Sequence, residues 1–137
     1  MADEQTPKRR KETVRTALRG LLAATFVTAG VLHFTSTETY LRVMPPYLPY
    51  PRTLVLVSGA AEIAGGLGVL VPRLRRAAGW GLVALLVAVF PANVHMALNP
   101  DQIAGLNIAP MLLWLRLPFQ AVLIAWVWWC AVASAPR

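Results

Sequence analysis

Long runs of apolar residues, separated by short connections, constrain this chain more than any other feature of its sequence. An α-helix rises about 1.5 Å per residue, so roughly 20 residues cross the 30 Å hydrocarbon layer of a bilayer. The runs here have about that length. They predict an all-α membrane protein, a bundle of four transmembrane helices over about residues 17–34, 53–71, 77–98 and 111–134.

Composition agrees with a membrane protein, because 57% of the 137 residues are hydrophobic and only 14% are charged. A soluble domain of this length could not bury so much apolar surface. Residues 1–15 differ, since they are polar and include a basic run, and we expect them to form a disordered cytoplasmic tail. The remaining residues, 16–137, are predicted to form one transmembrane domain.

The net charge of +7 is distributed in the way that sets membrane topology. Cytoplasmic connections are enriched in Lys and Arg. Clustering at the ends of the apolar runs argues against nucleic acid as a partner and for the bilayer. An N-in, C-in orientation follows, with ten basic residues inside (Lys8, Arg9, Arg10, Lys11, Arg15, Arg19, Arg73, Arg75, Arg76 and Arg137) and three outside (Arg42, Arg52 and Arg116). Arg19 lies within the first span, and we expect its long side chain to reach the membrane interface.

Two smaller features bear on function. The single cysteine, Cys130, lies in an apolar run, which excludes an intramolecular disulfide and indicates a buried hydrophobic residue. The segment 44–51 holds four prolines and is therefore stiff. It is either a rigid elbow between two helices or a lid over an outer-leaflet pocket, with Pro45, Pro46 and Tyr47 as the lid candidates.

The polar residues inside the predicted spans are the candidate functional groups, because ionisable groups in hydrocarbon cost several kcal/mol unless paired or hydrated. With the topology above, all of them fall at the midplane or in the outer half. They are His33, Glu62, Asn93, His95, Arg116 and Gln120.

Helical spacing predicts that these groups converge. Glu62 shares a face with small residues of its own helix, which are typical of helix contacts. Small and polar stripes on two other helices end at His33 and His95. Asn93 lies on a different face from His95, so both reach one site only if the Pro91 kink rotates the end of that helix.

Three interpretations of the cluster remain open. It could be structural, with Glu62 paired to Arg116 or to a histidine. It could bind a small outer-leaflet ligand such as a quinone, with histidine and carboxylate handling protons. A metal site of His33, Glu62 and His95 is the least supported, because these residues lack the local spacing of a metal motif.

Five segments occur in an order that resembles the DoxX family of small bacterial membrane proteins. The resemblance covers about residues 16–131 and implies a four-helix bundle in the bacterial cytoplasmic membrane. The segments are Gly30–Phe34, Met44–Pro49, Ser58–Gly68, Phe90–Met96 and Arg116–Gln120.

The DoxX resemblance also implies a link to respiratory, thiol or oxidative-stress chemistry, including a subunit of a thiosulfate:quinone oxidoreductase. The resulting hypothesis is an accessory, non-catalytic component of a quinone-linked redox system, with membrane redox subunits as partners. Two alternatives use the same cluster: a transporter or channel subunit with an ion or proton site, and a membrane enzyme acting alone on a lipid-soluble substrate. The apolar faces are also compatible with a homo-oligomer.

Overall fold

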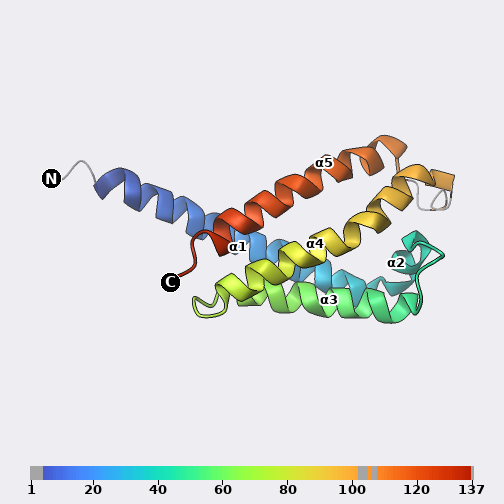
Figure 1. Cartoon of the computed structure of the whole chain (residues 1–137), viewed down its shortest axis with the longest axis horizontal. Helices are drawn as coiled ribbons and strands as arrows, with labels where there is room; N and C mark the ends of the chain where they lie inside the picture. The colour runs from blue at the N-terminus through green and yellow to red at the C-terminus, as the bar shows by residue number, and fades with distance from the viewer. Residues whose placement is uncertain (1–4, 102–104, 106–107, 137) are drawn as a thin grey trace.

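The fold is all-helical in a computed structural model that describes residues 5–101, 105 and 108–136. Four long helices run side by side along the molecule, and a short helix lies at one end (Figure 1). The helices are α1 (Gln5–Thr35), α2 (Thr37–Val43), α3 (Pro51–Gly68), α4 (Arg75–Leu98) and α5 (Pro110–Val127), followed by a π-helical turn, η2 (Trp128–Val132). The long helices overlap the four predicted apolar runs, although α3 ends at Gly68, before the predicted end at residue 71, and η2 ends at Val132, before residue 134.

The first helix starts earlier than expected. We expected disorder over residues 1–15, but α1 begins at Gln5, so residues 5–15 are helical, and residues 1–4 lie outside the described part of the chain. Lys and Arg are good helix formers, and Arg15 pairs with Glu12 one turn earlier at 3.0 Å. The basic segment therefore continues the first long helix, and in Figure 1 it projects beyond the other helices.

Glycines set the close approach of α1 and α3. A Cβ atom added at Gly30 would lie 2.6 Å from the backbone oxygen of Gly59, and one added at Gly59 would lie 2.6 Å from the Cβ of His33. At the other end of α3, a Cβ at Gly66 would lie 3.1 Å from the backbone oxygen of Ala23. Only residues without a side chain allow helices to pack this closely.

The core occupies the end of the bundle where η2 lies. Its buried side chains come from α1, α4, α5 and η2 and from the residue that follows α3, and all are apolar: Leu22, Ala23, Phe26, Val69, Leu82, Leu86, Val127, Cys130 and Ala131. The burial of Cys130 agrees with the interpretation of this residue as a hydrophobe. A smaller cluster of Met96, Ala97 and Leu113 lies at the other ends of α4 and α5.

A buried arginine ties α1 to η2. Arg19, which the sequence placed at the membrane interface, is only 6% exposed. Its Nε donates to the backbone oxygen of Cys130 at 2.9 Å, and its Nη2 donates to Oγ of Ser134 at 2.8 Å. The end of a helix leaves carbonyl groups without helical partners, and the guanidinium satisfies one of them here.

The proline-rich segment forms a compact connection at the opposite end of the molecule. The preceding helix, α2, was not predicted, and the sequence showed no apolar run there. Pro45 is fully buried, and Tyr50 adopts a left-handed conformation (φ 49°) just before Pro51 starts α3. Proline at the first position of a helix costs no hydrogen bond.

Among the residues that the structure describes, three helices are long and apolar enough to cross a membrane: Thr6–Thr35, Arg75–Leu98 and Pro110–Val132. The chain is therefore consistent with a membrane protein. Among the described helices, α3 is long enough to span but is less apolar than these three. It has 18 residues and includes Arg52, Glu62 and several glycines, which lower its mean hydropathy.

Candidate functional site

A cavity with mainly apolar walls and a few polar groups lies between the helices at the level of Glu62. Its volume is about 210 Å³. The helix α1 packs against η2 but not along α5, and the two helices diverge away from η2 (Figure 1). The cavity occupies the space that this divergence leaves. Its walls come from α1, α3, α4 and α5: Thr25, Phe26, Ala29, Glu62, Leu86, Val89, Asn93, Arg116, Phe119, Gln120 and Leu123.

Two buried amides hold α4 and α5 together at this cavity. Nδ2 of Asn93 donates to Oε1 of Gln120 at 2.6 Å, and Nε2 of Gln120 donates to the backbone oxygen of Leu86. Asn93 is 7% exposed and Gln120 is 4% exposed. Hydrogen bonds between membrane helices favour association, so this pair has a structural role.

Glu62 faces α1 between the two glycine contacts of α3. Its Oε2 lies 3.4 Å from Nδ1 of His33. That nitrogen lies 2.8 Å from the backbone oxygen of Ala29, which can only accept a hydrogen bond, so Nδ1 carries the proton and donates it there. Among the residues that the structure describes, Oε2 of Glu62 therefore has no hydrogen-bond partner.

Tyr40 of α2 covers the other side of His33. The two rings stack with centroids 4.0 Å apart and an interplanar angle of 22°. Burial raises the pKa of the Tyr40 hydroxyl, the negative charge of Glu62 raises it further, and the positive charge of Arg116 opposes both effects. The pKa of Tyr40, on α2, therefore depends on both charged residues of the cavity. This contact could not be predicted, because α2 is a short helix without an apolar run.

Arg116 is the cation of the cavity. It is exposed on α5 and also lines a surface groove of that helix with Phe119. The described residues show no ion pair between Arg116 and Glu62 within 4.0 Å. Of the two pairings in the structural interpretation, the Glu62–Arg116 pair is therefore not what the geometry shows, whereas Glu62 does lie within ion-pair distance of a histidine, His33.

His95 does not join the cavity. Its ring contacts Tyr47 edge-on, with centroids 5.8 Å apart, and its Nδ1 lies 3.4 Å from Nδ2 of Asn99. The helix α4 presents Leu86, Val89 and Asn93 to the cavity, so the expected convergence of the stripe that ends at His95 is wrong. Asn93 and His95 occupy different faces, and only Asn93 reaches the site.

The metal interpretation required His33, Glu62 and His95 to meet, and His95 lies away from the other two. In the described ranges, no group of three His, Cys, Asp or Glu side chains is arranged to hold a metal ion. Of the six candidate residues, Glu62, Asn93, Arg116 and Gln120 line the cavity, His33 lies beside Glu62, and His95 lies under the proline-rich segment.

The lid candidates have separate environments. Pro45 is buried, Pro46 is exposed, and the exposed ring of Tyr47 reaches His95 rather than the cavity. Within the described residues, none of the three lines the cavity. These positions favour the rigid elbow over the lid.

A family model described as "Domain of unknown function (DUF8561)" matches residues 22–131. The chain belongs to this family. The match begins at the buried Leu22 and ends at Ala131 in η2, so DUF8561 includes the core, the cavity and the elbow. No curated protein and no solved structure matches the chain.

Membership of DUF8561 corrects the resemblance to DoxX, because no DoxX model matches. Several of the segments that carried the resemblance do structural work in this fold. Gly30 and Gly59 allow α1 and α3 to touch, and Pro45 fills a buried position in the elbow. Unrelated membrane bundles need the same small residues and prolines for close packing, so such segments do not identify a family. The redox associations that DoxX implied fall with the resemblance.

Proposed function

We propose that the chain crosses the bilayer four times, with α3 as the additional span. Each of the four long helices exposes large apolar side chains, as lipid-facing helices do. On α3, Val57 is 59% exposed, which matches Leu21 on α1 (56%), Val87 on α4 (58%) and Val122 on α5 (59%). The 18 residues of α3 span about 27 Å, close to the hydrocarbon thickness.

We infer the N-in, C-in orientation from the position of the basic residues. The start of α1, the α3–α4 turn and the end of the chain gather at one end of the molecule (Figure 1). That end carries the majority of the Lys and Arg residues, and the positive-inside rule assigns it to the cytoplasm. The cavity, which lies toward the opposite end, is then in the outer half of a cytoplasmic membrane.

On this topology, the cavity binds the polar head of a small lipid-soluble molecule. The observation that carries the proposal is the buried, unpartnered Oε2 of Glu62 in a cavity that also holds Arg116. An unpaired carboxylate oxygen in a membrane protein costs several kcal/mol, and a ligand hydroxyl would offset that cost. Arg116 would donate to an acceptor oxygen of the same ligand.

A quinone is the ligand class that suits these two groups. In the reduced form, one hydroxyl can donate to Glu62 while the oxygen of the other accepts from Arg116. The gap between α1 and α5 offers a lateral route from the lipid, past exposed Thr25 and Phe119. The accessory role in a quinone-linked redox system remains part of this proposal, and the cavity supports only its ligand-binding step.

Transport is less well supported by the geometry. Beyond the cavity, toward η2, the described side chains of the core cluster are apolar, including Phe26, Leu82 and Val127, and the buried Arg19 beside them is bonded to η2. A polar pathway would have to displace this packed core. An enzyme acting alone would need an acid and a base at the ligand, and His33 is committed to Ala29 and covered by Tyr40.

The test is binding of a short-chain quinol, the reduced form that carries hydroxyl groups, to the full chain in nanodiscs under reducing conditions, followed by tryptophan fluorescence during the titration. Each charge-assisted hydrogen bond is worth about 1.5–3 kcal/mol, so Glu62→Gln and Arg116→Gln should each weaken binding about 10- to 100-fold. Glu38→Gln is the matched control, because Glu38 is an exposed carboxylate paired with Arg52 and does not line the cavity. Equal affinity in wild type and both cavity variants would contradict the proposal.

A further inference from the structure

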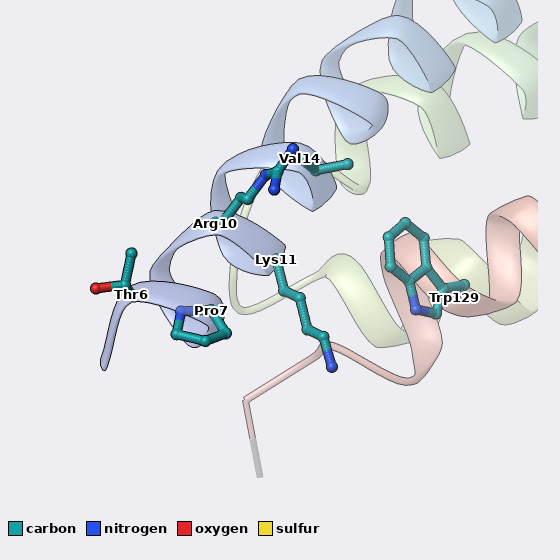
Figure 2. Close-up of a pocket in the computed structure, with 6 residues that line it drawn as sticks. All are labelled: Thr6, Pro7, Arg10, Lys11, Val14 and Trp129. Carbon is teal, nitrogen blue, oxygen red and sulfur yellow. The ribbon is translucent and has the colours of Figure 1, made fainter. Parts of the chain in front are cut away.

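A second hollow lies at the predicted cytoplasmic end, between the start of α1 and η2. Figure 2 shows the side chains of α1 on one side and the Trp129 ring on the other. The groove has a volume of about 460 Å³ and an open mouth. It is lined by Thr6, Pro7, Arg10, Lys11, Val14 and Trp129.

Helical spacing places these α1 residues on one face. Positions 6, 10 and 14 follow each other at intervals of four, and 7 and 11 lie beside them. Lys8 and Arg9, which belong to the same basic run, do not line the groove. The structure therefore divides four consecutive cations into a pair at the groove and a pair away from it.

The two groove cations have no acidic partner in the part of the chain that the structure describes. Within residues 5–15, the acidic residue is Glu12, and its carboxylate pairs with Arg15 at 3.0 Å. Arg15 also lies over the Trp129 ring, 4.8 Å from its centroid, and this cation–π contact holds the indole against the groove. Arg10 and Lys11 remain exposed at the mouth.

We propose that this groove binds the phosphate headgroup of an anionic phospholipid of the adjacent leaflet. Arg10 and Lys11 supply the complementary charge, and Val14 and Trp129 supply an apolar wall for the glycerol and upper acyl region. The groove lies where α1 leaves the apolar core, at the level where tryptophan and basic residues meet headgroups in membrane proteins.

The test compares two double variants of equal charge, R10Q/K11Q and K8Q/R9Q, in the full chain. Native mass spectrometry measures the retained phosphatidylglycerol, with phosphatidylcholine and glycerol 3-phosphate as separate arms. Each basic residue near an anionic surface changes affinity about fivefold. We expect R10Q/K11Q to lose about 25-fold in phosphatidylglycerol affinity and K8Q/R9Q to lose less than fivefold.

The other outcomes overturn the proposal. Equal losses in the two double variants would show a general charge effect without a site. Phosphatidylcholine retained as strongly as phosphatidylglycerol would exclude anion selectivity. Glycerol 3-phosphate bound as tightly as the lipid would show that a free phosphate, rather than a lipid, is the ligand. Retention of the α-helical circular dichroism spectrum in each variant separates these results from loss of the fold.

Discussion

Replacing Gly59 by alanine should loosen the contact that brings His33 beside Glu62. The added Cβ would lie 2.6 Å from the Cβ of His33 and 2.9 Å from the backbone oxygen of Gly30. Ordinary carbon–carbon contacts are about 3.5–4.0 Å, so α1 and α3 would have to separate by about 1 Å. Overpacking of this kind costs about 1–3 kcal/mol.

The chain provides controls for the intrinsic effect of alanine in a helix. Around both Gly20 and Gly81, an added Cβ would meet nothing within 4 Å. Alanine is favoured over glycine in a helix by about 1 kcal/mol, so Gly20→Ala and Gly81→Ala should be neutral or stabilising. Gly59→Ala gains the same propensity but pays the steric cost, so it should be about 1–3 kcal/mol less stable than these controls.

The assay is reversible unfolding of the purified chain in mixed detergent micelles, followed by far-ultraviolet circular dichroism. The three variants differ from wild type by the same single methyl group, so the comparison isolates its surroundings. A Gly59→Ala protein as stable as Gly20→Ala would refute the close α1–α3 crossing and, with it, the placement of His33 next to Glu62.

Three further predictions follow from single contacts. Arg19→Met should destabilise the chain by about 2–3 kcal/mol in the same unfolding assay, because it removes the two hydrogen bonds to η2 and its flank, and an unchanged stability would contradict that pin. A double-mutant cycle of Asn93→Leu and Gln120→Leu should give a coupling of about 0.6–1.7 kcal/mol, whereas additive losses would show that the amides act independently. Glu62→Gln should lower the pKa of Tyr40, because it removes a negative charge that disfavours tyrosinate. Ultraviolet titration in a background without the other two tyrosines measures this shift, and no shift would mean that Glu62 is neutral or remote.

Hydrophobicity predicted the helices well because their cause is local. An apolar run in lipid can satisfy its own backbone as a helix, and a helix overlaps each expected run, although only three of the described helices are apolar enough to span a membrane. The two surprises, α2 and the helical residues 5–15, are amphipathic or charged segments whose conformation depends on what they join. Neither segment contains an apolar run, so hydrophobicity alone could not predict that it is helical.

The sequence predicted some residues of the candidate site but not how their helices are rotated. Intramembrane polarity identified Glu62, Asn93 and Gln120, and the structure places them at one cavity. It could not decide which face of α4 turns inward, so His95 was expected at the cavity and lies elsewhere. Arg19 was assigned to the interface because its distant partner, the backbone oxygen of Cys130, is available only once η2 packs against α1.

The most direct test of the central claim is the sidedness of the two ends of α3. In a Cys130→Ala background, single cysteines at Tyr50 and Arg73, both exposed, are labelled with a membrane-impermeant maleimide in intact cells and in inverted vesicles. Four spans with both termini inside predict labelling of position 50 only from outside and of position 73 only from the cytoplasmic side. Labelling of both positions from the same side would show that α3 does not cross, and the Glu62 cavity would lose its place in the outer leaflet.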